Sequence, residues 1–573
     1  MVRIFTITTF FFAFGHVFAQ SPSLIYFKGL GRTLIDVDHL KESSNYLKGD
    51  TGVSDRRDLN GNFIFDLGIN VEPSEQMRAK AIMRLSNQFG NFFGNGSLFN
   101  FRQVSIEGIL AKKFYYQVGD IDLKMTPFTM YNFNDSWYDF ESTVFSDRRK
   151  IMQYENFNNG NAWRVQGLNF KTDWKFPKWA DTVSLNTFGV RNKYNNLSDT
   201  NDRLLIGSQL LLVGKKWIDL GVRIVHHFDV VGTSETQLRN YKNTVYSANG
   251  AVKWQNKQLD LRLNAEGGMS DYYKENKATK THYSTQDTYF ESDLKVRHKK
   301  TGLFVKGLYR NVGAEFFSAA AQTRRINDFG VTKLFEKGQN GNIARTQTQM
   351  DRIQNPGLYN TNINEGLGAY YLPYNIINPY GSATPNRVGF VGSIGIVSPD
   401  SLVDAKIEYT TMNELTALRV DQKRKFTGLA LGGNLMVNKF FKFKKHIILS
   451  GGYQSNSVKR DGNTNVNLTA TTLDCGLDIE VAEQLDLIVG YKQFSASGEE
   501  ALEIRNEFNV ITTNYTLLKF NQKENILAFG GKYRMSPYSY MSVNYLLPTY
   551  NNGLNDNFNY SYSQVFFNLT LAF

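Results

Sequence analysis

Apolar and polar residues alternate with a period of two along most of this 573-residue chain, and no other feature limits its fold as strongly. Successive side chains of an extended strand point to opposite faces, so this period predicts strands with one apolar and one polar face. The segments LDLRLNAE at 259–266 and LDCGLDIEV at 473–481 are two examples with ionised polar faces. The charged residues on such faces are Arg78, Lys80, Arg84, Asp260, Arg262, Glu266, Asp474, Asp478, Glu480, Lys532 and Arg534.

The number of these strands decides between two all-β architectures. A soluble sandwich closes with roughly six to ten strands, whereas this chain contains about 20, within a range of about 16 to 22. The sequence offers no second architecture to cover so many apolar faces. We therefore predict a single transmembrane antiparallel β-barrel over residues 20–573, with apolar faces toward lipid and the charged residues lining its lumen. A solenoid or a sandwich is the alternative.

The overall composition fits a barrel with a polar lumen. Charged residues make up 21% of the chain, aromatic residues 14%, and the mean hydropathy is −0.38. The 65 Lys and Arg residues exceed the 53 Asp and Glu residues, for a formal charge of +12. Because the cations alternate with apolar residues and form no single patch, we expect no nucleic-acid partner. Cys475 is the only cysteine, which excludes an intramolecular disulfide.

Residues 1–19, MVRIFTITTFFFAFGHVFA, predict a secretory signal peptide. Arg3 precedes an apolar run that ends at Phe18, and the small residue Ala19 stands at the expected cleavage point. The run is too short to cross about 30 Å of hydrocarbon, which needs roughly 20 apolar residues. We therefore expect an exported mature chain that starts at Gln20.

Short and long connections between the predicted strands alternate along the chain. Tight turns such as 481–485 and 534–539 fall on one side, and longer connections at 123–163, 495–523 and 314–424 fall on the other. Membrane barrels of this kind have short periplasmic turns and long extracellular loops. The final strand should therefore descend to a C-terminus in the periplasm.

The longest connection, 314–424, is far above ordinary loop lengths. It predicts a large extracellular loop that forms a small cap or folds into the lumen as a constriction, with a passive lid as the alternative. Its arginines are candidates for pairing with lumen acids, and its tyrosines lie in a Tyr- and Asn-rich stretch suited to contacts with a partner or a glycan. The candidate contact residues are Arg324, Arg325, Tyr370, Tyr371 and Tyr374.

The chain ends in VFFNLTLAF, where the apolar residues Phe567, Leu569, Leu571 and Phe573 share one face. We expect this strand to pair with the N-terminal one and remove the edges of the sheet. This last strand resembles the terminal strand of Gram-negative outer-membrane β-barrels, and the signal peptide and the alternating strands resemble the same class of proteins. The resemblance implies an outer-membrane lipid environment and recognition of those four residues by the barrel-assembly machinery. Stretches rich in Asn, Tyr and Lys are similar to those of large Bacteroidota barrels without an assigned function.

No pattern in the sequence predicts an enzyme, a metal site or a cofactor. His226 and His227 are neighbours on one predicted strand and therefore face opposite sides, and the other histidines are scattered near turns or loops. The sequence also lacks a phosphate-binding loop, a nucleophile elbow and zinc-ligand spacing. The histidines of the expected mature chain are His39, His226, His227, His282, His298 and His446.

Two non-enzymatic functions fit a barrel of this size. The first is a channel or transporter for hydrophilic solutes, gated or covered by the long loop, because a wide barrel with mixed lumen charges encloses an aqueous path. The second is a rigid subunit or platform of a multiprotein outer-membrane assembly, secretion or surface complex, held through partner proteins. The obstructing loop and the mixed charges of the lumen favour the second, and the common role of such barrels favours the first.

Overall fold

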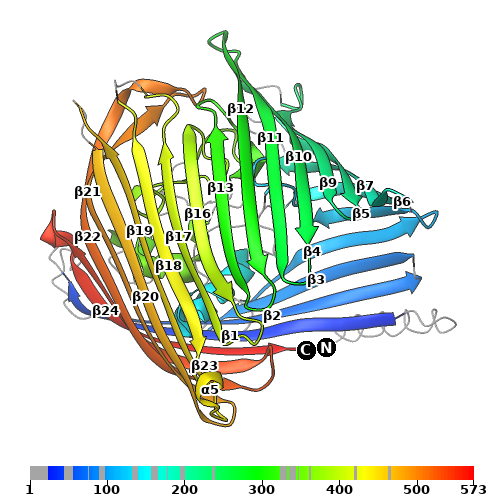
Figure 1. Ribbon diagram of the computed structural model, residues 1–573. Helices are drawn as coiled ribbons and strands as arrows, with labels where there is room; N and C mark the ends of the chain where they lie inside the picture. The colour runs from blue at the N-terminus through cyan, green and yellow to red at the C-terminus, as the bar shows by residue number, and fades with distance from the viewer. Residues whose placement is uncertain are drawn as a thin grey trace, which may run out of the picture.

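A closed ring of antiparallel strands dominates the computed structural model (Figure 1). Twenty-two strands form one sheet, and the sheet closes because β1 pairs with β24. This result confirms the predicted all-β barrel and the pairing of its first and last strands, at the upper limit of the expected strand number. The structure describes residues 24–43, 56–74, 76–89, 97–131, 140–156, 165–176, 178–193, 201–234, 239–322, 332–334, 343–345, 347–359, 363–368, 370–418, 422–462 and 466–573.

The strands vary widely in length, and several extend beyond the others. The barrel strands are β1 (Leu24–Ser43), β2 (Arg56–Ser74), β3 (Met77–Gln88), β4 (Ser97–Leu110), β5 (Phe114–Ile121), β6 (Val165–Phe176), β7 (Ala180–Lys193), β8 (Arg203–Gly214), β9 (Ile218–Asp229), β10 (Arg239–Gln255), β11 (Leu259–Asn276), β12 (Thr281–His298), β13 (Leu303–Val312), β16 (Arg387–Val397), β17 (Val403–Asn413), β18 (Lys425–Met436), β19 (Ile447–Arg460), β20 (Val466–Ala482), β21 (Leu485–Arg505), β22 (Ile511–Arg534), β23 (Tyr540–Asn552) and β24 (Tyr560–Ala572).

The remaining elements are short helices and one small hairpin. No helix in the described ranges is long and apolar enough to cross a membrane. These elements are α3 (Thr143–Asn156), α4 (Gln349–Gln354), α5 (Val437–Phe441), the 3-10 helices η1 (Ala319–Ala321), η2 (Pro356–Leu358), η3 (Leu372–Tyr374) and η4 (Asp556–Phe558), and the paired strands β14 (Thr332–Leu334) and β15 (Ile343–Arg345).

Two predicted connections have the wrong boundaries. The excursion that starts after β13 ends at Asn386 rather than at 424, because β16 and β17 are strands of the barrel wall. Glycines interrupt the alternation in β16: a Cβ at Gly389 would meet the carbonyl oxygen of Thr411 at 2.1 Å. The range 495–523 is mostly strand, since β21 and β22 continue as a paired ribbon to a turn near 506–510.

Most tight connections lie at one end of the barrel, which we call the turn end, and the opposite end is the loop end; the short turn between β11 and β12 is an exception at the loop end. The predicted turns at 481–485 and 534–539 are confirmed, because β20 to β21 and β22 to β23 are joined there. β1 begins and β24 finishes at the turn end (Figure 1).

The last residue completes the closure of the barrel at the turn end. The amide N of Phe573 donates to the carbonyl oxygen of Gly29 at 3.1 Å, and the amide N of Gly29 donates back at 2.9 Å. The ring of Phe573 covers Gly29 and stacks on Phe65 at a centroid distance of 5.8 Å. A Cβ at Gly29 would lie 2.1 Å from Cζ of this ring, so glycine makes the room that the terminal aromatic side chain occupies.

The two faces of the wall differ as the alternation predicted. On β24, Val565, Leu571 and Phe573 are exposed on one face, while Phe566 and Asn568 are buried on the other. Apolar side chains are exposed on the same outer face of many strands, among them Phe27, Ile206, Leu220, Val222, Phe390, Ile394, Ile407, Leu487, Val489, Phe529 and Val543. An apolar exterior of this kind is the surface that a barrel presents to lipid.

Two connections fold into the barrel. We call residues 122–156, with α3, the first lumen segment, and residues 313–386, with η1, α4, η2 and η3, the second lumen segment; both names refer to their described residues. Phe145 of α3 and Ile353 of α4 pack in one cluster with the wall residues Ile488 and Phe566. Of the two arrangements predicted for the long excursion, the described part therefore adopts the one inside the lumen.

Candidate functional site

Ion pairs attach the C-terminal half of α3 to the wall. Asp66 on β2 accepts hydrogen bonds from Arg84 Nε at 2.7 Å and from Tyr154 Oη at 2.6 Å. Arg84 also pairs with Glu155, the penultimate residue of α3. Arg102 on β4 donates to the same Asp66 carboxylate at 2.7 Å. Arg102 also donates to the backbone carbonyl oxygen of Tyr154 at 2.7 Å, so this end of the helix is bound to three neighbouring strands.

The middle of α3 is attached to the strands on either side of the closure. Arg148 Nη2 lies 2.6 Å from Oδ1 of Asp36 on β1, and its guanidinium carbon lies 3.6 Å from the ring centroid of Phe566 on β24. Lys532 Nζ on β22 lies 2.5 Å from Oδ2 of Asp147. The contacts reach helix positions that face in different directions, so they fix both the place and the rotation of α3.

Four charged groups meet beside α3, against β20 and β21. Lys492 Nζ lies 2.6 Å from Glu141 Oε1 and 2.6 Å from Asp474 Oδ2. Arg149 donates to both oxygens of Glu141, at 2.7 and 2.9 Å. The backbone N of Ser142 donates to Asp474 Oδ1 at 2.9 Å. We call Glu141, Arg149, Asp474 and Lys492 the buried quartet; its two anions balance its two cations.

The quartet controls the ionisation of Glu141. Burial alone would raise the pKa of this carboxyl, but the adjacent Arg149 and Lys492 outweigh it and hold the pKa at about 2. Glu141 is therefore a carboxylate over the whole neutral range. Removing either cation would leave a buried charge without compensation, which is costly in the protein interior.

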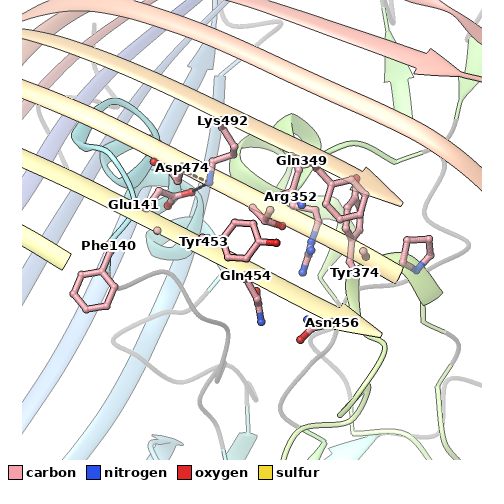
Figure 2. A pocket seen from close by; sticks show the side chains of 15 residues that line it. Phe140, Glu141, Gln349, Arg352, Tyr374, Tyr453, Gln454, Asn456, Asp474 and Lys492 are labelled. Carbon is pink, nitrogen blue, oxygen red and sulfur yellow. Dashed lines mark hydrogen bonds and ion pairs between the residues drawn. The ribbon is translucent and has the colours of Figure 1, made fainter. Parts of the chain in front are cut away.

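A pocket of about 70 Å³ separates the quartet from the second lumen segment. Figure 2 shows Glu141, Asp474 and Lys492 at one edge, with Arg352 and Tyr374 at the other. Gln349, Gln454, Asn456 and Thr472 add further hydrogen-bonding groups to its lining. The space holds a few water molecules or one small polar group.

The second lumen segment meets the wall at α4 and η3. Tyr374 Oη donates to Glu524 Oε1 at 2.5 Å, and the backbone N of Gln349 donates to the other oxygen of Glu524 at 2.6 Å. Tyr371 Oη donates to Gln522 at 2.7 Å. Tyr374 is buried inside the barrel, and the half-buried Tyr370 packs on Tyr380 at a centroid distance of 5.4 Å. The expected contacts of these tyrosines with a partner or a glycan stay a prediction.

Another part of this segment is attached to β8 and β11. Glu365 lies 2.6 Å from Arg203 Nη2 and 2.8 Å from Lys274 Nζ, and Arg203 also pairs with Asp229 at 2.6 Å. Partial burial would raise the pKa of Glu365, but Arg203 and Lys274 hold it at about 2. Charge therefore fixes this segment to a wall region distant in sequence from α4.

The charged positions predicted for the lumen fall into three groups. Arg84, Asp474 and Lys532 contact the first lumen segment as described above, and Glu266 accepts a hydrogen bond from Thr126 at 2.6 Å. Asp478, Glu480 and Arg534 meet at the turn end. Arg78, Lys80, Asp260 and Arg262 lie near the ends of strands; Arg78 pairs with Glu72 and Glu107, and Asp260 and Arg262 are exposed.

Arg324 and Arg325 lie outside the described residues, so their predicted pairing with lumen acids stays a prediction. The structure assigns other cations to those acids: Lys492 to Asp474, and Arg534 to Glu480. Lys492 could have been found in the sequence, because it stands on the inward face of an alternating strand. Glu141, Arg149 and Glu365 carry no such signal, since they lie in segments without a strand period.

Comparisons with solved structures return proteins of Pseudomonas and Acinetobacter species. The chain is similar to OccK8 (OprE) of Pseudomonas aeruginosa, with 9% identity, a TM-score of 0.37, and coverage of 96% of this chain and 98% of that one. It is similar to OccAB2 of Acinetobacter baumannii, with 8% identity, a TM-score of 0.36, and coverage of 96% and 100%. A BenF-like porin of Pseudomonas fluorescens Pf-5 gives 7% identity, a TM-score of 0.35, and coverage of 95% and 99%.

Neither protein-family models nor curated proteins match this sequence. Likenesses to solved structures at these identities and TM-scores carry no functional conclusion, and the fold assignment rests on the strand pairing of this chain itself. The narrower resemblance to Bacteroidota barrels stays an expectation from the sequence. The described residues nevertheless establish a closed barrel with an apolar exterior and a lumen narrowed by two ion-paired segments.

Proposed function

We propose that this protein is an outer-membrane channel for small hydrophilic solutes, with a fixed constriction built from its two lumen segments. The observation that carries the proposal is the closed 22-stranded wall, apolar outside and ionised inside. Barrels of this strand number enclose a lumen wide enough to hold a plug or an aqueous path. The turn end would face the periplasm, as short turns do in bacterial barrels.

A fixed constriction is one of the forms expected from the sequence for the long loop, which is predicted to gate or cover the channel. Ion pairs attach α3 to β1, β3 and β22, and Lys492 on β21 holds Glu141 just before the helix. Glu365 attaches the second lumen segment to β8 and β11. Moving either segment would separate buried charges from their partners, which costs several kcal/mol per pair. Solutes would therefore pass beside these segments, and a small polar passage would select hydrophilic solutes by size.

Single-channel recording in planar lipid bilayers tests the channel. Wild-type protein should give discrete conductance steps. Lys492→Met should give larger and noisier steps, because it removes the cation that joins Glu141 to Asp474. Lys519→Met is the matched control, because Lys519 is exposed on β22, and its conductance should equal that of the wild type. Folded wild-type barrels that insert without any conductance would refute the channel.

The second candidate is a rigid platform within a multiprotein outer-membrane complex. It is favoured by the density of buried ion pairs, which would fill a lumen that has no transport role. Native membranes extracted with mild detergent distinguish the two functions. Co-purification of a stoichiometric set of partner proteins, together with silent bilayers, would support the platform.

A further inference from the structure

His446 is not isolated, although the sequence suggested scattered histidines. It lies at the turn end, between α5 and β19, and its ring faces three carboxylates from neighbouring strands. Asp478 and Glu480 come from the end of β20, and Asp486 comes from the start of β21. Possible ligand atoms of His446, Glu480 and Asp486 all lie within 4.8 Å of one another.

Three of these groups converge on a single point. Nη2 of Arg534 lies 3.0 Å from Glu480 Oε1, 3.0 Å from Asp486 Oδ1 and 3.3 Å from His446 Nδ1. A cation thus already occupies the position that all three ligand atoms face. One imidazole nitrogen with two carboxylate oxygens is a donor set that suits zinc and similar divalent ions.

The fourth group, Asp478, faces Nε2 of the imidazole, which also lies 3.3 Å from Asp486 Oδ1. Oδ1 of Asp478 lies 3.4 Å from His446 Nε2, the residue is 7% exposed, and this buried oxygen accepts no hydrogen bond of normal geometry. A carboxylate that accepts the second ring N–H of a metal-bound histidine fixes its tautomer and orientation. Asp478 occupies the position for this role, which would give its buried oxygen a partner.

The charges of the cluster leave room for a divalent ion. The three carboxyl groups outnumber the one guanidinium, that of Arg534, at the site. The Arg534 side chain is 38% exposed, whereas those of Asp478 and Asp486 are 10% and 3% exposed. The arginine can therefore turn toward solvent, while the backbone holds the ligands: the amide N of Glu480 donates to the carbonyl oxygen of His446 at 3.0 Å.

We propose that His446, Glu480 and Asp486 form a binding site for a divalent transition-metal ion of the zinc type, oriented by Asp478, and that the ion replaces the Arg534 guanidinium. The bound ion would join the turn ends of β19, β20 and β21 on the lumen side of the wall. This inference is independent of the proposed channel, since it concerns binding alone.

Calorimetric titration of the full-length barrel in detergent micelles with zinc chloride, after chelator treatment and dialysis, tests the site. Wild-type protein should bind one ion saturably. His446→Ala should abolish that binding, and Asp478→Asn should weaken it about tenfold, as the loss of an orienting carboxylate does. His298→Ala is the matched control, because His298 lies at another turn of the same barrel end, and it should bind like the wild type.

Arg534→Gln gives the sharpest test, because it removes the competing cation without removing a ligand. Zinc affinity should rise about tenfold or more, since the net charge at the site becomes more negative. A structural ion-pair network alone predicts no saturable binding in either the wild type or Arg534→Gln, and that result would overturn the site. Binding by His446→Ala equal to that of His298→Ala would overturn it as well. Heat-dependent gel mobility verifies that each variant is a folded barrel.

Discussion

The two lumen segments are fixed in the same barrel by different interactions. The first segment adds a set of ion pairs to its apolar packing: Asp147, Arg148, Glu155 and the quartet member Glu141 all pair with wall residues. The second segment uses mainly rings and apolar side chains, with Glu365 as its charged attachment to the wall. Low pH, or replacement of a charged residue, should therefore reduce amide protection in the first segment and leave the second segment packed.

Phe317 gives the best example of attachment by apolar packing. Its ring meets Tyr272 at a centroid distance of 5.1 Å, and its backbone N and O bond to Ser270 and Asn243 on the wall. Glu141 is the corresponding residue for attachment by charge, because it pairs with both Arg149 and Lys492. Substitutions at these two positions therefore test whether each segment depends on its own kind of contact.

The largest effect is expected for Phe317→Ala. Loss of a buried phenylalanine ring costs about 3–5 kcal/mol, so amides of residues 316–321 should exchange with solvent at least about a hundredfold faster. Hydrogen exchange followed by mass spectrometry measures this change. The exposed outer-face substitution Phe390→Ala should leave the same amides unchanged. Equal loss of protection in α3 would contradict separate attachment of the two segments.

Glu141→Gln should have the next largest effect, on the other segment. The variant leaves Arg149 and Lys492 with one remaining acid in the quartet, at a cost of about 3 kcal/mol. Amide protection in α3 should fall about a hundredfold by this estimate, while protection around Phe317 should persist. Glu483→Gln, at an exposed turn position, is the control. Unchanged protection of α3 would show that apolar packing alone holds the helix.

Acidification should reproduce the effect of Glu141→Gln without a mutation. The pKa of Glu141 is lowered from 4.5 to about 2 in the fold, so its stabilisation is complete above about pH 4.5 and is lost as the pH falls toward 2. Protection factors of α3, corrected for intrinsic exchange, should decrease across this window. Glu365 is more exposed, with 35% of its side chain in solvent, so a smaller decrease is expected near it. The same decrease around Phe317 would contradict the comparison.

The smallest effect is expected for Thr348→Ala. Thr348 caps α4, and its hydroxyl and the Asp351 carboxylate satisfy each other's backbone amides. Loss of an N-cap costs about 1 kcal/mol, which predicts roughly fivefold faster exchange of α4 amides. The α3 amides serve as the internal control. A larger loss that spreads to α3 would show that the two helices open together.

The predictions from the sequence succeeded where the period of two is unbroken. That period gave the barrel, the closure through β24 and the opposite exposures of Phe566 and Leu571. They failed where the period is broken by glycine, as at Gly389 in β16, and in the ribbon of β21 and β22, where Gly498 and the two glutamates after it interrupt the alternation. Backbone hydrogen bonds to the neighbouring strands hold those segments in the sheet, and the pattern of side chains in the sequence does not reveal such bonds.

By itself, the sequence determined which face of each strand is apolar and which is charged, because alternation is a local property of an extended chain. The tertiary structure alone decided which charges meet. Glu141 and Lys492 are 351 positions apart, and His446 meets Asp478 and Asp486 across three strands. Such partners are chosen by barrel closure, by register and by segments folded into the lumen, and these depend on contacts between distant parts of the chain.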